Sequence, residues 1–410
     1  MVIIIIYYII FSITLIYGLY FGITGLIGII KKPIIKYKDS NIINKFAILV
    51  AARNESSVIG NLIDSLNEIN YPKDKYDIYV IPNNCTDDTE EISKRHGAKI
   101  LDCTVPTRTK GEVLKFAFDK LKPKQDIDAY IVFDADNVVH PEFLNKMNLA
   151  LNSGYRVAQC FRDAKNPSDS WLSGSYMLFY YIQNVFFNHA RMTFNGSSSI
   201  NGTGFMIKKE YIDKNGFNTY SLTEDVEFTG QCALNKEKIV FVEDAITYDE
   251  YPVSFASSWK QRKRWTAGML TCMRLYSPKL FVDYLKTGNI ASLDMCLTYL
   301  APVIQILSFV NLIMLIVFRY TGIELFDIFS AFFATRWVYF IIAYLCSILL
   351  ELFVLLYKKK KPSKVISGIL LFTLFIFTWI PINIVCVLKK QTKWEVIKRG
   401  ADVKINDILE

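Results

Sequence analysis

The chain has 410 residues, of which 52% are hydrophobic, and a formal net charge of +8 at pH 7. This length allows about two or three domains of roughly 150 residues. The apolar residues form continuous runs, which indicates a membrane protein rather than a soluble protein with a larger core. The positive excess lies beside these runs, where basic residues orient a chain and meet anionic lipid, so we set nucleic acid aside as a partner.

Cysteine and histidine provide little chemistry. The eight cysteines include no CxxC pair, and only three histidines are present. We therefore predict neither a zinc site nor a redox pair, and expect free thiols in a reducing cytosol.

The first apolar run covers residues 1–30 and is followed by Lys31 and Lys32. It is longer than the roughly 20 residues that cross a bilayer. It has no basic segment before it and no small-residue cleavage site, so we predict an uncleaved anchor rather than a signal peptide. The lysines behind it place the next domain in the cytoplasm by the positive-inside rule.

Between this anchor and the next long apolar run, short strands alternate with amphipathic helices. Strands are predicted at 46–51, 76–82 and 129–133, and helices at 56–69 and 86–96. Such alternation predicts a parallel sheet that binds ligands at the carboxyl ends of its strands. Four polar residues fall at these ends: Asn83, Asn84, Asp134 and Asp136.

Three further runs, at 293–318, 332–357 and 365–388, are long enough to span a membrane. The four lysines at 358–361 should be cytoplasmic, which agrees with one outward and one return crossing. A third full crossing would carry a basic segment outside, against the same rule: Lys389, Lys390, Lys393, Lys398 and Arg399. Either the run at 365–388, which contains Pro381, is re-entrant, or the number of spans is wrong.

Three motifs carry the candidate chemistry. Asp134 and Asp136 directly follow a predicted strand and offer hard oxygen ligands for a divalent cation, although a turn with Asx hydrogen bonds has the same pattern. The triplet at 223–225, Thr-Glu-Asp, places acids before a predicted helix and is also typical of a helix N-cap. Residues 261–265, Gln-Arg-Lys-Arg-Trp, would also suit an amphipathic helix at the headgroups.

These three motifs, in this order and between apolar spans, resemble those of membrane-embedded family 2 glycosyltransferases of the cellulose, chitin and hyaluronan synthase type. The resemblance covers residues 47–265. It implies a GT-A-like α/β domain with a mostly parallel sheet, flanked by transmembrane helices and followed by an amphipathic interfacial helix. The implied domains are an anchor at 1–30, a cytoplasmic transferase domain at 31–250, interfacial helices at 251–290, a transmembrane region at 291–390 and a tail at 391–410.

The resemblance also implies roles for single residues. Asp225 corresponds to the general base, and Asp134 and Asp136 to the ligands of Mg²⁺ or Mn²⁺, with Asp134 also near the donor. Arg264 would neutralise the pyrophosphate, and Lys110, in a Lys-Gly pair, would lie near the donor. Residues implied on the acceptor side are Gly202, Thr203, Gly204, Glu224, Gln261 and Trp265.

One position departs from the family pattern. Asn83 stands where family members carry an Asp that contacts the base of the nucleotide. An amide both donates and accepts hydrogen bonds, so uridine stays compatible with this site. Asp87 and Asp88 are predicted at the start of the next helix rather than at the donor.

The function implied by the resemblance is transfer from a UDP-sugar, of the glucose or N-acetylglucosamine type, to a growing polysaccharide. Transfer would be inverting, processive and coupled to export by a multi-pass protein of the cell membrane, in contact with membrane lipids. A partner subunit or self-association would supplement the few spans. Two alternatives stay open: a non-processive transferase that adds one sugar to a membrane lipid, and an inactive scaffold or regulatory subunit.

Overall fold

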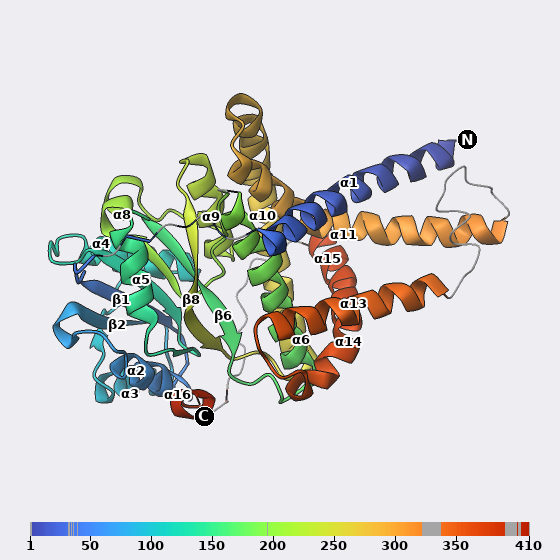
Figure 1. The fold of residues 1–410 in the computed structure, drawn as a ribbon. Coiled ribbons are helices and arrows are strands. Elements are labelled where there is room, and N and C mark those ends of the chain that lie inside the picture. Colours follow the sequence, from blue (N-terminus) through green and yellow to red (C-terminus); the bar gives the residue numbers. More distant parts are fainter. Residues whose placement is uncertain are drawn as a thin grey trace.

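The computed structural model describes residues 2–409 except 32, 34, 36, 39, 195, 322–337, 390–399, 401 and 402. A sheet domain lies at one end of the molecule, and long apolar helices extend away from it on one side (Figure 1). The amino end of the chain lies at the far tip of the first helix, whereas the carboxyl end returns to the sheet domain.

One eight-stranded sheet forms the centre of the domain, in the order β3-β2-β1-β4-β7-β6-β8-β5. Four neighbouring pairs are parallel, and the pairs β4–β7, β6–β7 and β5–β8 are antiparallel. The predicted α/β class with a mostly parallel sheet is therefore confirmed. The strands are β1 (Phe46–Ala52), β2 (Tyr76–Pro82), β3 (Lys99–Ile100), β4 (Ala129–Asp134), β5 (Val138–Val139), β6 (Val157–Ala164), β7 (Phe205–Lys208) and β8 (Ile239–Asp249).

The three predicted strands exist, and their carboxyl ends lie side by side. Ala52 is in register with Pro82, and Ala51 with Asp134. Nearly every residue of β1 and β4 is buried, as expected for parallel strands that are covered on both faces. The sheet therefore ends at one common edge, where Asn83 and the Asp134 motif follow.

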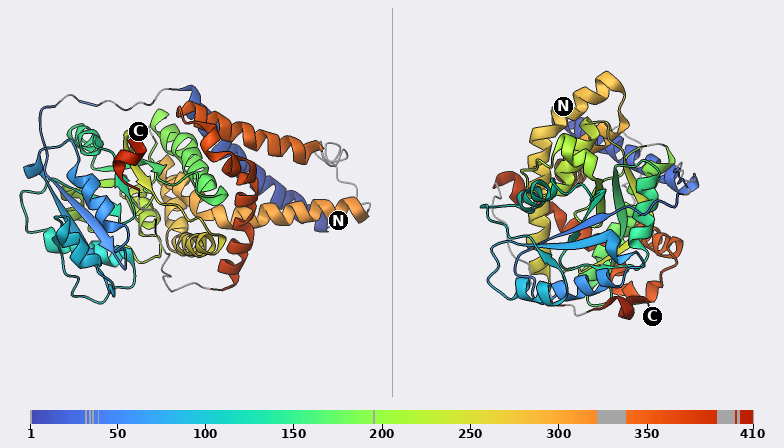
Figure 2. Two further views of the ribbon diagram at one scale, coloured as in Figure 1. Left: turned by 90° about the horizontal axis from the view of Figure 1, so that it is seen from below. Right: turned by 90° about the vertical axis from the view of Figure 1, so that its left-hand side faces the viewer.

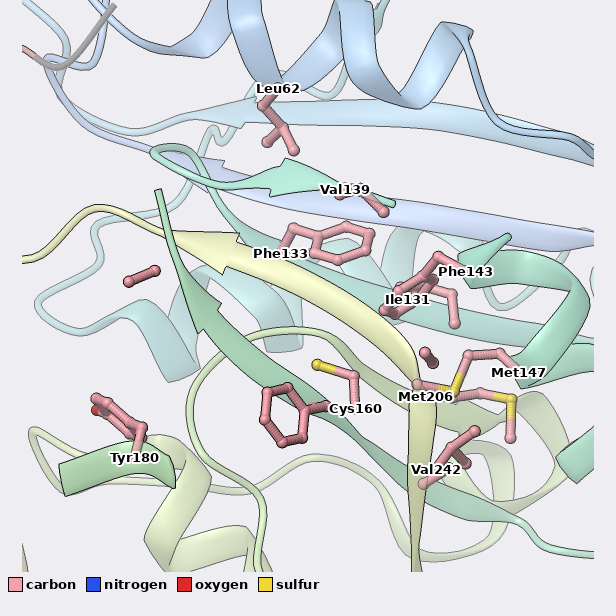
Figure 3. Close-up of a cluster of buried hydrophobic side chains, with 14 of the residues drawn as sticks. Leu62, Ile131, Phe133, Val139, Phe143, Met147, Cys160, Tyr180, Met206 and Val242 are labelled. Carbon is pink, nitrogen blue, oxygen red and sulfur yellow. The ribbon is translucent and has the colours of Figure 1, made fainter. Parts of the chain in front are cut away.

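Helices cover both faces of this sheet. Phe133 and Leu62 pack on one face, to which Ile48 also belongs (Figure 3). Leu49 and Val132 pack on the other face. The covering helices are α2 (Ile59–Asn67), α3 (Thr89–Arg95), α4 (Lys110–Leu121), α5 (Phe143–Asn152), α8 (Lys209–Asn215) and α9 (Glu224–Leu234), with a short 3₁₀ turn at Lys73–Lys75. The predicted helices at 56–69 and 86–96 are present but shorter, because turns precede both.

Four helical stretches are long and apolar enough to cross a membrane: Val2–Ile30, Ile290–Phe318, Phe340–Tyr357 and Pro362–Leu388. They belong to α1 (Val2–Ile30), α11 (Ile290–Thr321), α13 (Val338–Tyr357) and the last run, which comprises a 3₁₀ turn (Pro362–Val365), α14 (Ile366–Phe377) and α15 (Trp379–Leu388). The helix predicted at 332–357 begins outside the described residues, at 332–337.

The remaining helices join these spans to the sheet. A continuous helical stretch, not predicted from the sequence, leaves β6 and returns toward β7. It consists of α6 (Trp171–Ile182), a π-helical segment (Gln183–His189) and α7 (Ala190–Thr193). The motif at 261–265 lies on the long helix α10 (Phe255–Thr287), and the short α16 (Ile405–Leu409) ends the described chain.

The last apolar run differs from the other three in direction. Two views show α14 and α15 crossing the ends of α1, α11 and α13 that face the sheet, instead of running beside them (Figures 1 and 2). The run bends at Thr378, as expected because Pro381 cannot donate a hydrogen bond to the preceding turn. α14 packs on α6, and α15 packs on α10.

Both flanks of this run contact the sheet domain. Before it, Lys358 pairs with Glu243, and Lys360 lies 2.7 Å from Asp163. After it, Ile405 of α16 packs against Val138 and Tyr248. This arrangement favours the re-entrant interpretation of 365–388 over a further crossing.

Candidate active site

A cavity of about 720 Å³ lies between the carboxyl edge of the sheet and the apolar helices. All three motifs reach it, although they are far apart in the sequence. Ten of the twelve residues predicted for the site line this cavity: Asn83, Lys110, Asp134, Asp136, Gly202, Glu224, Asp225, Gln261, Arg264 and Trp265. The fold therefore brings the Asp134 motif, the acids at 224–225 and the 261–265 helix into one chamber.

Lys110, the first residue of α4, connects two of these motifs. Its Nζ lies 2.5 Å from Asp134 Oδ1 and 3.3 Å from Glu224 Oε1, and donates to the carbonyl of Gly202 at 2.7 Å. Burial alone would lower the pKa of Lys110, but the charges of Asp134 and Glu224 outweigh burial and raise the pKa. Lys110 is therefore charged, and it holds two acids that would otherwise repel each other.

The neighbouring Gly111 lets α4 approach this closely. A Cβ at Gly111 would lie 2.1 Å from Thr219 Oγ1 and 3.0 Å from the Cβ of Glu224. Any larger residue at this position would push α4 away from the acids. The Lys-Gly pair therefore combines a positive charge at Lys110 with the space that only Gly111 leaves.

Asp225 lies in the first turn of α9 and faces the glycine segment. A Cβ at Gly202 would lie 3.3 Å from Asp225 Oδ2, so the carboxylate stands against that turn. Burial, together with the charge of Glu224, raises the pKa of Asp225 to about 7. A carboxylate with such a pKa accepts a proton near neutral pH, which is what a general base requires.

The triplet at 223–225 acts as a helix cap only in part. Thr223 is the N-cap residue of α9, but its side chain makes no capping hydrogen bond. Its Oγ1 instead packs against α10, where a Cβ at Gly268 would lie 2.2 Å away. Thr223 thus fixes the spacing between the acids and the helix of the third motif.

The helix of the third motif is anchored by an arginine that the motif pattern does not single out. Arg262 is fully buried and donates to Thr378 Oγ1 at 2.6 Å and to the carbonyl of Phe375 at 3.2 Å. Both acceptors lie at the bend of the last apolar run, where α14 ends. These two contacts fix the position of α10 against the bend.

Arg264 and Trp265 occupy different surroundings beside this anchor. Arg264 lines the cavity, and no described residue pairs with its guanidinium, of which Nε is buried. Trp265 stacks on Trp379 at a ring-centroid distance of 6.2 Å and meets Tyr176 edge-on at 6.0 Å. An unpaired cation in a cavity is costly to keep, so Arg264 is the strongest candidate for an anion ligand.

Thr203 and Gly204 are not among the cavity-lining residues. Thr203 is fully buried and accepts a hydrogen bond from the backbone N–H of Asp134 at 3.0 Å. A Cβ at Gly204 would lie 2.1 Å from the sulfur of Cys160, and Gly204 donates to the carbonyl of Val132 at 2.8 Å. The geometry gives both residues a part in holding the end of β4, and the acceptor contact predicted for them stays untested.

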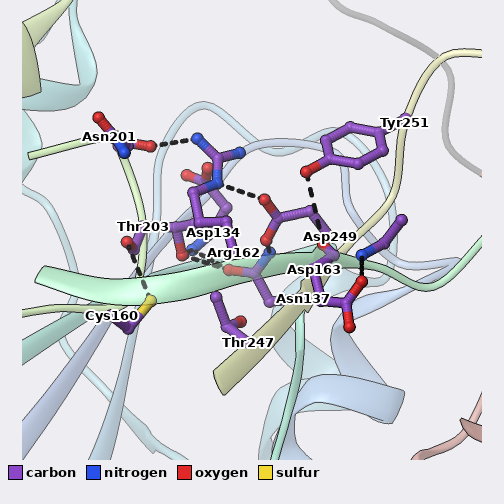
Figure 4. A network of polar contacts seen from close by, with 12 residues as sticks. Asp134, Asn137, Cys160, Arg162, Asp163, Asn201, Thr203, Thr247, Asp249 and Tyr251 are labelled. Atoms are coloured by element: carbon purple, nitrogen blue, oxygen red, sulfur yellow. Dashed lines mark hydrogen bonds and ion pairs between the residues drawn. The ribbon is translucent and has the colours of Figure 1, made fainter. Parts of the chain in front are cut away.

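Sequence reasoning missed a polar network beneath the acids. Arg162 of β6 donates to Asp249 and to the carbonyl of Asn201 (Figure 4). Its guanidinium lies 4.0 Å from the ring centroid of Tyr180. Asn137 extends the network, because its Nδ2 donates to Asp249 at 2.7 Å while its Oδ1 accepts from the N–H of Asp134 at 3.0 Å. The orientation of the Asp134 motif thus depends on partners in β6 and β8.

The expected donor end of the cavity contains Asn83. This residue directly follows β2, and its Nδ2 donates to Thr107 Oγ1 at 2.5 Å. Asp88 is the N-cap residue of α3, as predicted. Arg53 and Glu55, which follow β1, also line the cavity and were not predicted from the sequence. Their position just beyond a buried strand was the available signal.

Asp134 and Asp136 fit a divalent cation only as part of its coordination shell. Both line the cavity with hard carboxylate oxygens. Within the part of the chain that the structure describes, no cluster of three or more His, Cys, Asp or Glu side chains could hold a metal ion. The pair therefore suits a Mg²⁺ or Mn²⁺ that keeps water or ligand oxygens, as these ions commonly do beside phosphates.

The cavity continues from the acids into the apolar helices. It is lined there by residues of all four candidate spans: Tyr17, Phe21, Thr298, Ala301, Pro302, Gln305, Leu350, Phe372, Ile376, Trp379 and Asn383. One chamber thus joins the charged edge of the sheet to the interior of the helical region.

Comparison with known proteins agrees with this geometry. Residues 44–268 match the family model described as "Glycosyltransferase like family 2". A beta-monoglucosyldiacylglycerol synthase of Nostoc sp. is 26% identical over 227 residues, which cover 54% of this chain and 48% of that protein. A poly-beta-1,6-N-acetyl-D-glucosamine synthase of Staphylococcus epidermidis is 24% identical over 276 residues, or 63% of this chain and 65% of that one. The chain spans about half to two-thirds of the length of these relatives.

A solved structure shows the same fold over nearly the whole chain. It is a mannosyltransferase of Pyrobaculum calidifontis in complex with GDP-Man and Mn²⁺, with a TM-score of 0.61 at 15% identity. The alignment covers 92% of this chain and 99% of that one, so the likeness includes the apolar helices. The predicted GT-A-like fold is thereby confirmed.

Proposed function

This chain belongs to the glycosyltransferase-like family 2, and we propose that it transfers one sugar from a UDP-sugar to a lipid acceptor that reaches the site from the membrane. The observation that carries the proposal is the single cavity that joins Asp225 and Arg264 to the interior of the candidate spans. A transferase for soluble acceptors would have no use for an apolar inner half.

The extent of the cavity supports a lipid better than a translocated polymer. Among the cavity-lining residues of α11, Gln305 lies farthest from the start of the helix, at about 22 Å for a rise of 1.5 Å per residue. Among those of α1, Tyr17 lies farthest from the end of the helix, at about 20 Å. Both lie near the midpoints of their helices. No described residue of the outer halves of α1 and α11 lines the cavity. A polysaccharide in export would need a path through those halves, whereas a lipid of one leaflet would not.

The proposed reaction is a single displacement. The acceptor hydroxyl attacks the anomeric carbon of the donor sugar and forms the new glycosidic bond, while the bond from that carbon to the UDP oxygen breaks. The electron pair leaves with UDP, and the hydroxyl proton passes to Asp225. Attack from the face opposite the leaving group inverts the anomeric configuration.

Several side chains would have separate roles in this transfer. Arg264 would neutralise the diphosphate through its N–H groups as charge develops there. Asp134 and Asp136 would hold the divalent cation, which shields the same diphosphate. Lys110 keeps Glu224 and Asp134 in place, and Asn83 would face the uracil edge. The intact set of charged residues also argues against an inactive scaffold.

The test is a product analysis with the full chain in detergent and mixed lipid micelles. Radiolabelled UDP-glucose and UDP-N-acetylglucosamine are supplied with Mn²⁺, and the products are separated into lipid extract and aqueous polymer. We expect label in the lipid extract with one sugar per lipid, and loss of transfer when a chelator is added. Label in a high-molecular-weight aqueous polymer would overturn the lipid proposal in favour of the polysaccharide expected from the sequence.

A further inference from the structure

The inner half of the cavity, between the apolar helices, contains polar but uncharged side chains. None of the described cavity-lining residues on α1, α11, α13, α14 and α15 is charged, and the polar ones are Tyr17, Thr298, Gln305, Trp379 and Asn383. A phosphate placed there would lose its hydration without gaining a cation, at a cost of several kcal/mol. The inner half therefore suits an uncharged group.

Three of the polar residues near this region form a chain of hydrogen bonds. Thr266 Oγ1 donates to Asn383 Oδ1 at 3.0 Å, and Asn383 Nδ2 donates to Gln305 Oε1 at 2.6 Å. The chain ends at the Nε2 of Gln305, and no described residue accepts a hydrogen bond from that group. Thr266 and Asn383 are buried, so the orientation of the Gln305 amide is fixed from behind. Polar groups at this depth are expensive, which indicates a use for the free donors.

The reacting end of the cavity also indicates an uncharged acceptor. Glu224 and Asp225 border it, and because Lys110 is paired with Glu224 and not with Asp225, the charge of the Asp225 carboxylate would repel a phosphate nucleophile. A lipid phosphate is already ionised near neutral pH and needs no base, whereas an alcohol must lose a proton during attack. A site that keeps Asp225 beside the glycine segment is therefore built for a hydroxyl.

We propose, on the basis of the proposed lipid transfer, that the acceptor is an uncharged lipid alcohol and that Gln305, held by Asn383, binds an oxygen of its headgroup. The subsite lies between α11 and α15, on the membrane side of the acids. A lipid whose ester or ether oxygens follow its hydroxyl by a few bonds would place them at this depth. Lipid phosphates would be excluded by the acids at one end and by the lack of a cation at the other.

The first test compares three acceptors, each supplied separately. The full chain is supplied with radiolabelled UDP-sugar, Mn²⁺ and mixed micelles that contain dioleoylglycerol, dioleoylphosphatidic acid or farnesyl phosphate. We expect labelled product from dioleoylglycerol alone. Product from a lipid phosphate would overturn this inference and leave lipid transfer standing, whereas a polymer without labelled lipid would overturn both.

The second test uses Gln305→Met, with Asn311→Met as the matched control. Asn311 lies on the same helix and does not line the cavity. Loss of one neutral hydrogen bond should raise the KM for dioleoylglycerol roughly three- to tenfold in Gln305→Met, with little change in kcat. UDP affinity should stay the same in both variants. An unchanged KM for the lipid in Gln305→Met, or an equal rise in both variants, would contradict the subsite.

Discussion

The Nζ of Lys110 lies 2.5 Å from Oδ1 of Asp134, so an ammonium group occupies one flank of the carboxylate pair assigned to the metal. A metal ion and Lys110 would share or compete for the same carboxylate. The contact explains how several acids coexist in one cavity before the donor arrives, and it has a measurable consequence.

We predict that Lys110→Met binds Mn²⁺ more tightly than the natural protein when no donor is present. Removal of a competing positive charge should strengthen binding about three- to tenfold, or roughly 1 kcal/mol, because the pair is partly exposed. Electron paramagnetic resonance titration of free Mn²⁺ measures this, with Lys115→Met on the outer face of the same helix as the control. Weaker Mn²⁺ binding in Lys110→Met would mean that Lys110 does not act on the metal ligands.

The first half of the sheet could be predicted from the sequence, because β1, β2 and β4 are apolar runs, interrupted only by Asp77 in β2, and polar residues stand at or just beyond their ends. β6 escaped prediction for a physical reason: Gln159, Arg162 and Asp163 are all buried in it, so its pattern does not look like a core strand. These polar residues are satisfied by partners from other elements, which a single sequence does not display.

The candidate site was foreseeable in the same uneven way. The residues of the three motifs can be recognised in the sequence, because each motif combines particular residue types at short spacing. Arg162 was invisible, since Asn201 and Asp249 lie 39 and 87 residues from it in the chain. The role of Arg262 also escaped prediction, because its partner Thr378 lies 116 residues further along the chain.

The raised pKa of Asp225 predicts a pH profile. Its base form is populated above about pH 7 and lost as the pH falls, so kcat/KM for the donor should drop about tenfold per pH unit below 7 and level off above it. Because the charge of Glu224 contributes to the raised pKa, Glu224→Gln should move the midpoint to lower pH. A flat profile from pH 5 to 8, or an upward move in Glu224→Gln, would show that Asp225 does not control the rate.

The unpaired guanidinium of Arg264 predicts opposite effects on binding and stability. Arg264→Met should weaken UDP binding about 10- to 100-fold through loss of charge-assisted hydrogen bonds, and Arg264→Lys should lie in between. The melting temperature of the ligand-free Met variant should be unchanged or higher, since a half-buried charge without an ion-pair partner is removed. Calorimetry in detergent gives both quantities, with the exposed Lys260→Met as the control. A large loss of stability without loss of UDP affinity would make Arg264 structural.

The course of the last apolar run predicts the side of the carboxyl end. We expect Lys404→Cys to be labelled from the same side of the membrane as Lys115→Cys, and Tyr320→Cys, near the end of α11, from the opposite side. A membrane-impermeant maleimide on oriented vesicles measures this in a background without the natural cysteines that are not buried, namely Cys85, Cys103 and Cys346. Labelling of Lys404→Cys together with Tyr320→Cys would establish a further crossing by residues 362–388.

Asp225 is the group that accepts the proton of the acceptor hydroxyl in the proposed reaction. Asp225→Asn keeps the shape of the side chain and the first turn of α9 while removing the basicity. The measurement pairs the rate of sugar transfer to lipid with the affinity for UDP, and the exposed Asp119→Asn is the control. We predict that transfer falls about 10²- to 10⁴-fold while UDP affinity is retained. Near-normal transfer in Asp225→Asn would contradict the account, and a joint loss of transfer and UDP binding would assign Asp225 to the structure of the site instead of the chemistry.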